Sequence, residues 1–356
     1  MTEDGRRREW LAPFPVDVRL VLSVHRHGGG DPAFRAEPGG AIWRTSLTPA
    51  GPVTLRVTAG NPPGPAGPAA SAAPPGPAAP PGPAGPPGPA APPGPAGPAG
   101  EAAPGAGAGA GGGTLVVARA WGPGADWMLA ALPDLLGAGD DPSGFRPEHP
   151  LLRYAVRRYP GFRVGRSGRV LEALVPAVLE QKVVGLEAFR AWRLLLRRFG
   201  LAAPGPAPAG MCVCPPAATW AAIPTWEWHR AGVEGIRAAT IRAAVRVAGR
   251  LEQIVTLPAA EADRRLQSLS GIGIWTSAEI RQRACGDPDA VSVGDYNLPG
   301  AVGWALAGRV VDDAGMLELL APYAGHRYRA TRLIELTGTR PPRRGPRNSV
   351  RDYRAI

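Results

Sequence analysis

Hydrophobic and polar positions follow different patterns in the two parts of this chain. Before residue 60, and again just after residue 113, short apolar runs rich in β-branched residues are separated by Gly-rich turns, which is typical of strands. The expected strands cover residues 16–22, 41–45, 53–57 and 114–120. A helical pattern follows at residues 126–136. These elements predict a small α+β sheet domain made of residues 13–60 plus 114–140.

From residue 151 onward the apolar residues recur at the spacing of a helix. One such stripe consists of Leu186, Phe189, Trp192, Leu196 and Phe199. We therefore expect a mainly α-helical domain over residues 145–338. The predicted fold class is an α+β N-terminal sheet domain followed by this helical domain.

Three segments fall outside these patterns. Residues 61–113 consist mostly of Pro, Gly and Ala, with many glycines in one triplet register. Alanines such as Ala70 and Ala73 interrupt that register, and only glycine fits the axis of a collagen triple helix, so we expect a disordered insert. Residues 1–12 are expected to be a flexible N-terminus, and residues 339–356 a basic flexible tail.

The net charge of +11 favours a polyanionic partner. Lys182 is the one lysine among 40 basic residues, and all the others are arginine, whose planar guanidinium suits phosphate contacts. No apolar run reaches the roughly 18 residues that a membrane span needs, and the first residues lack the apolar core of a secretory signal. We expect a cytoplasmic, nucleoid-associated protein without a membrane partner.

The richest motif lies between residues 266 and 295. Residues 269–273, Leu-Ser-Gly-Ile-Gly, are typical of the hairpin in a helix-hairpin-helix, because the glycines permit a tight turn and close backbone approach to a ligand. Trp275 and Thr276 then open a second helix, whose free N–H groups can receive a phosphate oxygen. Asp295 follows about twenty residues after the hairpin, in an apolar-then-turn context.

This segment resembles the helix-hairpin-helix (HhH-GPD) DNA glycosylase superfamily, and most of all its bacterial 3-methyladenine DNA glycosylase II branch. Two further matches are the apolar segment 174–183, which contains Gln181, and the segment 322–329. The resemblance covers residues 151–338, about half of the chain. It implies a monomer that binds double-stranded DNA containing damaged bases and turns the damaged nucleotide out of the helix.

The resemblance makes Asp295 the catalytic residue. A fixed carboxylate stabilises the positive charge that builds on the sugar when the N-glycosidic bond breaks, or activates the attacking water. The alternative is a structural role, because an Asp after Gly often caps the helix that follows, and both roles can coexist. In lyase-type members a lysine stands at the position of Trp275, and indole cannot replace it. We therefore expect a monofunctional enzyme without AP-lyase activity.

The base pocket expected from the resemblance contains Trp275, Tyr296 and Glu279. Electron-rich aromatic faces attract a cationic alkylated base. Glu279 stands where the branch has a tyrosine, so it either contacts the base, marks a different substrate, or lies on a solvated helix face. Trp275 is equally suited to packing in the core beneath the hairpin.

The remaining predicted site residues would contact DNA. Gln181 and Lys182 would enter the minor groove and fill the gap left by the flipped nucleotide. Lys182 replaces a common apolar wedge and could pair with a phosphate instead, and an ordinary polar helix end is the alternative for both residues. The hairpin residues Gly271, Ile272, Gly273 and Thr276 would hold a phosphate of the DNA backbone.

No metal ligands or cofactors are expected, apart from a monovalent cation that hairpin carbonyls bind in related proteins. The iron–sulfur members carry four closely spaced cysteines after the catalytic region, but this chain has no cysteine beyond Cys285. Cys212, Cys214 and His229 do not make a zinc site.

The predicted function is base-excision repair of alkylated purines of the 3-methyladenine type. The alternatives are a non-catalytic DNA-binding module that uses the hairpin only as a phosphate clamp, and a glycosylase for another class of lesion.

Overall fold

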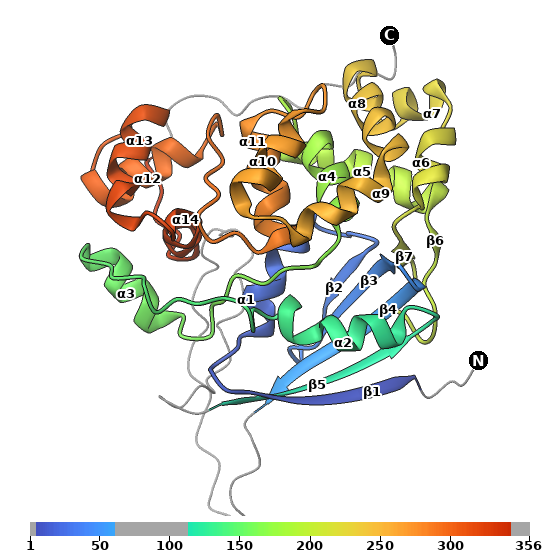
Figure 1. Ribbon diagram of the computed structural model, residues 1–356, viewed down its shortest axis with the longest axis horizontal. Coiled ribbons are helices and arrows are strands. Elements are labelled where there is room, and N and C mark those ends of the chain that lie inside the picture. Colours follow the sequence, from blue (N-terminus) through green and yellow to red (C-terminus); the bar gives the residue numbers. More distant parts are fainter. Residues whose placement is uncertain (1–4, 61–112, 343–356) are drawn as a thin grey trace, which may run out of the picture.

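The computed structural model describes residues 5–60 and 113–342. Its N-terminal part is a five-stranded antiparallel sheet with the strand order β1-β5-β4-β3-β2 (Figure 1). The strands are β1 (Arg6–Ala12), β2 (Phe34–Ala36), β3 (Ile42–Thr48), β4 (Gly51–Gly60) and β5 (Thr114–Trp121). Alternate residues of the central strands, such as Val53, Leu55 and Val57, are fully buried. One face of the sheet therefore supplies the core of this domain.

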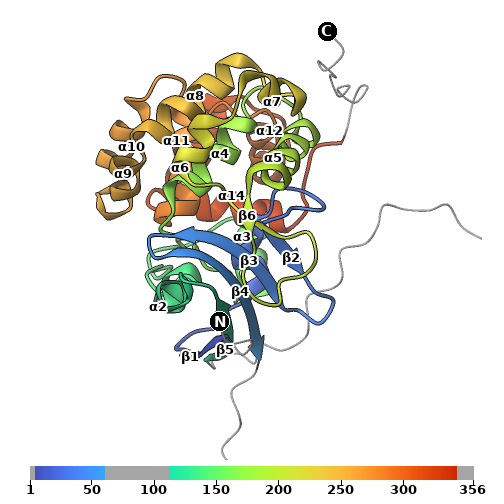
Figure 2. The ribbon, with the colours of Figure 1, turned by 90° about the vertical axis from the view of Figure 1, so that its right-hand side faces the viewer.

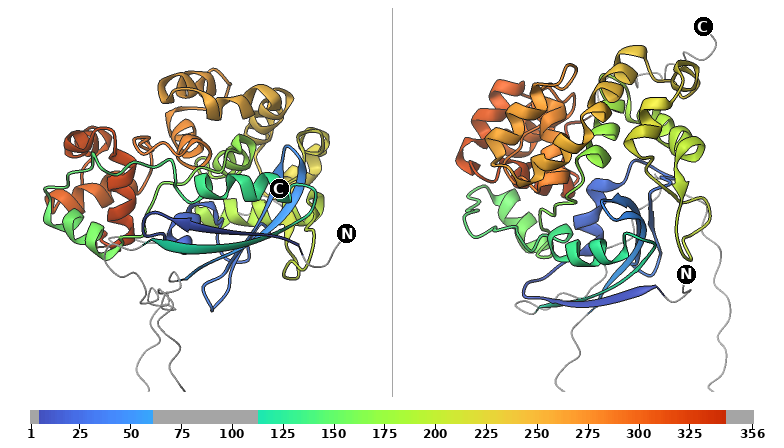
Figure 3. Two further views of the ribbon diagram at one scale, coloured as in Figure 1. Left: turned by 60° about the horizontal axis from the view of Figure 1, so that its bottom comes forward. Right: turned by 45° about the vertical axis from the view of Figure 1, so that its right-hand side comes forward.

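Two short helices complete the sheet domain. Helices α1 (Val18–Leu22) and α2 (Ala125–Leu135) bury their apolar residues against the sheet, and the turn η1 (Ser23–His25) follows α1. Met128, Leu132 and Leu135 supply the apolar side of α2. The predicted order of a sheet domain and then helices is confirmed, and in both views of Figure 3 the sheet lies to one side of the helices.

Two predictions for the N-terminal region are wrong. Residues 6–12 are not flexible, because they form β1, which pairs along its whole length with β5. Residues 16–22 do not form a strand: the Asp17 side chain accepts hydrogen bonds from the N–H groups of Arg19 and Leu20 and thereby starts helix α1.

The helical part contains two lobes with separate hydrophobic cores, which lie apart in Figure 1 and one behind the other in Figure 2. The larger one, here called the central lobe, packs Leu174, Trp192, Trp220, Ile241 and Ile280 into one core. Its helices are α4 (Val170–Leu179), α5 (Gly185–Phe199), α6 (Ala217–Ala222), α7 (Thr225–Arg230), α8 (Gly235–Arg246), α9 (Ala248–Glu252), α10 (Ala259–Gln267) and α11 (Ile274–Ile280), with the turns η2 (Gln253–Thr256) and η3 (Arg281–Cys285). A small ribbon of β6 (Leu201–Ala202) and β7 (Cys212–Val213) lies between α5 and α6.

The second lobe, here called the C-terminal lobe, includes one helix from earlier in the chain. Its elements are α3 (Pro150–Arg158), α12 (Leu298–Ala307), α13 (Asp313–Leu320), η4 (Ala321–Tyr323) and α14 (Arg327–Leu336). Leu152, Val302, Met316 and Ile334 lie in its core. Residues 286–297 connect the central lobe to α12, so a side chain on this segment lies at the junction of the two lobes.

In helix α5, the predicted apolar stripe is partly wrong. Ala188, Ala191, Trp192, Leu195 and Leu196 are its buried residues, whereas Leu186 is 70% exposed. Leu186 belongs to the first turn of the helix and projects beyond the end of the core.

One carboxylate makes several contacts between the sheet and the central lobe. Glu172 on α4 accepts hydrogen bonds from the Ser46 hydroxyl at 2.7 Å and the Leu47 N–H at 2.6 Å, and it pairs with Arg44 at 3.2 Å. All three partners belong to β3, and both charged side chains are almost fully buried. The sheet therefore fixes the position of α4. Gln181 and Lys182 follow the C-terminal end of this helix.

The predicted insert and basic tail lie outside the described residues, except for Gly113 and residues 339–342. Within the described part of the chain, no helix has the length and apolar character needed to cross a membrane.

Candidate active site

Asp295 lies at the junction of the two lobes, half-buried, with both carboxylate oxygens engaged. Its Oδ1 accepts the N–H groups of Asn297 at 2.8 Å and Leu298 at 2.9 Å, at the start of α12. Its Oδ2 accepts the indole N–H of Trp275 at 3.2 Å. The carboxylate thus binds the first N–H groups of a helix from two residues before its N-cap, and it also faces Trp275 just after the hairpin, so a structural and a catalytic role are compatible in one geometry.

The turn that presents Asp295 is fixed from both sides. Gly294 has a φ of +88°, a left-handed conformation that glycine adopts readily, and its N–H donates to Asp313 of α13 at 3.0 Å. The Asp295 N–H donates to the carbonyl of Ser292 at 3.2 Å. This turn places the carboxylate on the central-lobe side of α12.

Trp275 has one face in the core and its polar edge at the site. The ring is half-buried and packs against the core of the central lobe, as expected for a structural tryptophan. Its single N–H nevertheless points to Asp295. This hydrogen bond fixes the orientation of the carboxylate.

The hairpin has the local geometry that its sequence predicts. Gly271 has a φ of +86°, and a Cβ there would lie 2.1 Å from the hydroxyl oxygen of Thr240 on α8, so only glycine fits. Gly273 caps α11 without help from any side chain, and a Cβ there would meet no atom within 4 Å. The first N–H groups of α11 therefore lie next to an open approach.

Two hairpin residues differ from the expectation. The Ile272 and Thr276 side chains are buried, 4% and 2% exposed, because Ile272 belongs to the core of the central lobe and Thr276 faces Gln181. Direct contact between these side chains and DNA is therefore excluded in this conformation, and only their backbone atoms could make one.

Gln181 reaches the hairpin. Its amide nitrogen donates to the Gly271 carbonyl at 2.9 Å and to the Thr276 hydroxyl at 2.8 Å. The structure thus brings together three of the predicted DNA-binding residues, but Gln181 acts as a brace between the end of α4 and the hairpin. Sequence reasoning placed its side chain in the minor groove, and this geometry does not show that role.

Lys182 forms the tip of the turn between α4 and α5. It is exposed, with a φ of +55°, and it is the one non-glycine residue at positive φ within residues 5–60 and 113–342. A side chain in the left-handed region costs roughly 1–2 kcal/mol, so the surrounding structure must impose this conformation. The bonds of the neighbouring Gln181 are one such constraint.

Glu279 is not free to contact a base. One of its oxygens pairs with Arg283 at 2.6 Å and the other accepts the Ser292 hydroxyl at 2.5 Å. Its side chain is 12% exposed. Gln282, fully buried, donates to the same Ser292 at 2.9 Å. Glu279 and Arg283 are four residues apart, a spacing that predicts a helical ion pair and could have revealed this partner in the sequence.

Tyr296, predicted to line the base pocket, is 86% exposed. It follows Asp295 directly but no described side chain packs over its ring. In the structure, Trp275 therefore contacts Asp295, Glu279 is engaged by Arg283 and Ser292, and Tyr296 lies in solvent.

A charged cluster lies between the sheet domain and the turn that carries Lys182. It contains His25, His27, Glu180 and Arg283, of which the two histidines come from the segment after α1. The His27 ring lies 3.3 Å from Glu180, which directly precedes Gln181. Burial raises the pKa of Glu180, but the hydrogen bond and charge of His27 and the charge of Arg283 outweigh burial and hold that pKa below its usual value.

The pKa values of His25 and Arg283 in this cluster are also shifted. Burial lowers the pKa of His25 well below its usual value, and the nearby charges of Arg44 and Arg283 lower it further. Burial also lowers the pKa of Arg283, but the charges of Glu279 and Glu180 outweigh it and raise the pKa overall. We conclude that Arg283 is a largely buried cation between Glu279 and the end of α4.

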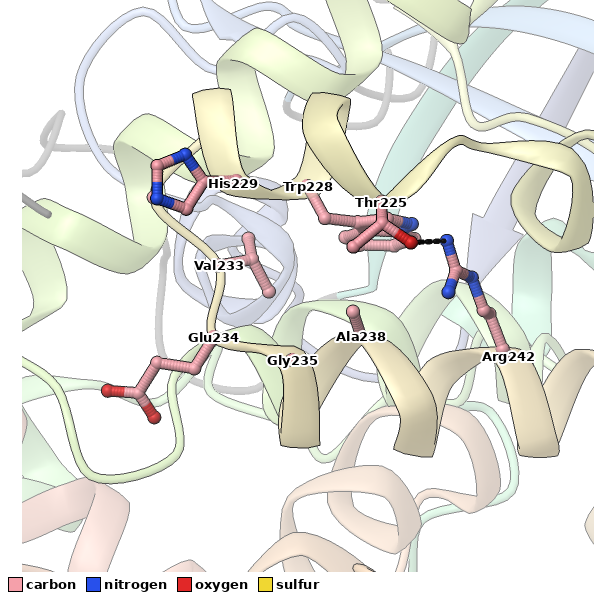
Figure 4. Close-up of a pocket in the computed structure, with 9 residues that line it drawn as sticks. Thr225, Trp228, His229, Val233, Glu234, Gly235, Ala238 and Arg242 are labelled. Carbon is pink, nitrogen blue, oxygen red and sulfur yellow. Dashed lines mark hydrogen bonds between the residues drawn. The ribbon is translucent and has the colours of Figure 1, made fainter. Parts of the chain in front are cut away.

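A separate pocket of about 390 Å³ lies between α7 and α8 (Figure 4). Trp228, Val233 and Ala238 supply much of its apolar wall, while Arg242 turns toward Thr225 at one end and His229 lies at the other. None of the predicted site residues lines this pocket.

The predicted monovalent cation at the hairpin carbonyls stays a prediction. The carbonyl oxygens of Leu269, Gly271 and Gly273 each accept a hydrogen bond, from Ile272, Gln181 and Ser277 respectively. A carbonyl oxygen has two lone pairs, so these hydrogen bonds do not prevent an ion from binding, and we assign no step to one. Cys212, Cys214 and Cys285 are free thiols, and no cluster of metal-ligating side chains occurs within the described ranges.

With this geometry established, comparison with solved structures defines the fold. The 3-methyladenine DNA-glycosylase from Archaeoglobus fulgidus aligns with a TM-score of 0.63 and 15% identity, over 92% of this chain and 97% of that one. The structure of MBOgg1 with a low-affinity DNA ligand aligns with a TM-score of 0.62 and 12% identity, over 95% and 98% of the two chains.

The 8-oxoguanine glycosylase/lyase from Clostridium acetobutylicum, in complex with double-stranded DNA containing cytosine opposite 8-oxoG, aligns with a TM-score of 0.59. Identity is 11%, over 94% of this chain and 97% of that one. No family model and no curated protein sequence matches the chain. The chain therefore has the fold of these DNA glycosylases along almost its whole length, which confirms the fold that the resemblance predicted.

Proposed function

We propose that this protein is a DNA glycosylase of the helix-hairpin-helix superfamily, in the bacterial 3-methyladenine DNA glycosylase II branch. Its substrate would be double-stranded DNA with alkylated purines, and it would act as a monomer in the cytoplasm. The observation that carries the proposal is the fixed carboxylate of Asp295, held by Trp275 and by the start of α12 next to the hairpin. The likeness of the whole fold to glycosylases supports it.

The chemistry follows from this carboxylate. When the N-glycosidic bond of a flipped nucleotide breaks, positive charge develops on the deoxyribose, and a nearby fixed anion stabilises that charge. Asp295 would also orient the water that attacks C1′ and take its proton. An alkylated purine carries its own positive charge and leaves as a neutral base, so one carboxylate is sufficient and no general acid is needed. Because Trp275 offers no amine, base release itself would form no bond between residue 275 and the sugar.

A second candidate is a glycosylase for a neutral lesion. Glu279 is paired with Arg283, so this carboxylate offers no free negative charge to a cationic base. One solved structure with this fold is named an 8-oxoguanine glycosylase/lyase. Because the pair is neutralised and largely buried, it gives a cationic base no advantage over a neutral one.

A panel of duplexes, each with one lesion, tests both candidates. Base release is measured as strand breaks after alkali treatment, on methylated purines, 8-oxoguanine, deaminated bases and undamaged DNA. We expect release from methylated purines, and Asp295→Asn should slow it by about 10²–10⁴-fold. The variant should still bind DNA with a tetrahydrofuran abasic analogue.

Three results would change this assignment. Release only from neutral lesions would favour the second candidate. Unchanged release by Asp295→Asn would refute the role of this carboxylate. Salt-sensitive binding without release from any lesion would identify a non-catalytic DNA-binding module.

A further inference from the structure

We infer that Lys182 is a nucleophile, and that the protein cleaves abasic DNA through an imine between the Lys182 amine and the sugar aldehyde. This inference rests on the proposed function, because it takes an abasic site at Asp295 as the substrate. It adds a second reaction to the hydrolysis of the base, so it replaces the expectation of a purely monofunctional enzyme, which considered only position 275.

The first support is the chemistry of the basic residues. Imine formation needs an amine that can lose its proton, and a guanidinium stays protonated in proteins. Of the 40 Lys and Arg side chains in this sequence, only that of Lys182 is an amine. A general attraction to phosphate would be met equally well by another arginine, which the chain uses at every other basic position.

The second support is the position of Lys182 relative to the candidate catalytic residue. The neighbouring Gln181 donates to Thr276, which follows Trp275 in α11, and Trp275 donates to Asp295. Two hydrogen bonds, joined through the neighbouring residues Thr276 and Trp275, thus connect the turn of Lys182 to the carboxylate. Lys182 is exposed, and the flexible four-carbon stem of a lysine lets its amine move through the solvent around this turn.

The third support is the backbone at this residue. Lys182 has a φ of +55° and an exposed side chain, although a glycine would remove the strain of the left-handed conformation. Strain of this kind, held by surrounding structure, is common at functional sites. Here Gln181 is anchored to the hairpin on one side, and α5 begins at Gly185 on the other.

The reaction balances without any cofactor. The Nζ lone pair forms a bond to C1′ of the ring-opened sugar, and the aldehyde oxygen leaves as water, which gives the imine. The Asp295 carboxylate takes a proton from C2′, the C3′–O bond breaks, and the phosphate leaves with the electron pair. Water then hydrolyses the imine, which releases an unsaturated aldehyde and restores the Lys182 amine.

The test uses the full chain and preformed abasic DNA, so it does not depend on base release. Borohydride reduces an imine to a stable amine, which links the protein to the DNA. We expect a covalent adduct with the aldehyde-containing site, a peptide map that places it on Lys182, and strand cleavage without borohydride. Both should be lost in Lys182→Arg, which keeps the charge, and in Lys182→Gly, which also relieves the backbone strain.

Affinity for the tetrahydrofuran analogue, which has no aldehyde, is measured for every variant, and adduct yields are compared at equal bound fractions. The inference is overturned if the wild-type protein binds this analogue but gives no adduct. It is equally overturned if the adduct persists in both variants or maps to the N-terminal amine, or if the protein does not bind abasic DNA. Release of methylated bases is assayed separately. In each of these cases, this assay shows whether the protein has the proposed glycosylase activity.

Discussion

At the scale of single residues, Asp295 owes its orientation to donors from both lobes. Its Oδ1 receives two N–H groups of the C-terminal lobe and its Oδ2 receives the Trp275 indole of the central lobe. A carboxylate fixed in this way need not reorganise when charge develops beside it, and such preorganised groups contribute strongly to catalysis.

Replacing Trp275 by Phe should separate the hydrogen bond from the packing of the ring. Phe keeps an aromatic side chain in the core but cannot donate to Asp295, so we expect base release under single-turnover conditions to slow by about tenfold, which corresponds to about 1.4 kcal/mol. Binding to the abasic analogue should change little. Trp226→Phe, at an exposed position of α7, is the control. An unchanged rate in Trp275→Phe would mean that the indole only packs.

The sequence predicted some of these residues for a clear physical reason. Gly271, Gly273 and Asp295 lie within one short motif, where spacing along the chain determines spacing in the structure. Glu279 was ambiguous because its two partners, Arg283 and Ser292, decide whether it faces solvent or is neutralised. Ser292 lies on a different segment, and no periodicity indicates that such a contact forms.

At the scale of elements, the turn after α4 and the hairpin before α11 behave as one unit. Gln181 joins them across 90 residues of sequence with two hydrogen bonds. Thr240 of α8 lies against the place where a Cβ at Gly271 would be, so a third element limits the hairpin. Contacts over such sequence distances explain why the bracing role of Gln181 was missed.

Gln181→Leu should loosen the hairpin without changing the size of the side chain. Two hydrogen bonds, one exposed and one half-buried, contribute about 1–3 kcal/mol together. We therefore expect faster hydrogen exchange of the amides in residues 269–276 and weaker binding to abasic DNA. Gln267→Leu, at an exposed position at the end of α10, serves as the comparison. Equal protection of the hairpin in both variants would contradict the brace.

Among the elements, β1 and α1 were assigned wrongly for different reasons. Strand β1 is rich in charge and pairs with β5, which comes after the insert, so its partner is distant in sequence. Helix α1 has only five residues, and Asp17 is the sole local sign of its start. The few apolar residues between positions 16 and 22 fit a short strand as well as a short helix, so their pattern could not distinguish the two.

At the scale of the whole molecule, a buried ion pair joins the end of the sheet domain to the C-terminal lobe. Arg329 on α14 pairs with Asp140, and their side chains are 3% and 1% exposed. Asp140 also accepts the Val164 N–H at 3.0 Å. The pair therefore holds together the α2–α3 connection, the segment before α4, and the last helix.

Asp140→Asn should destabilise the protein strongly, because it leaves the Arg329 charge buried without its partner. Loss of one member of a buried pair costs about 3–5 kcal/mol, and we expect a corresponding drop in the free energy of unfolding in urea. Asp126→Asn, which removes the partner of Arg6 in an exposed pair, should have little effect. Equal effects of the two substitutions would contradict the importance of burial here.

The register of β4 and β5 has a consequence for the length of the chain between them. Gly60 pairs with Leu115, so the polypeptide leaves the sheet and returns to it at neighbouring positions. A connection of any length starts and finishes at the same point, and each doubling of a flexible loop costs only about 0.6 kcal/mol. The pairing of β4 with β5 should therefore not depend on the segment that connects them. Replacing residues 61–112 by a four-residue turn, or by a fluorescent domain, should change the thermal unfolding midpoint by only a few degrees.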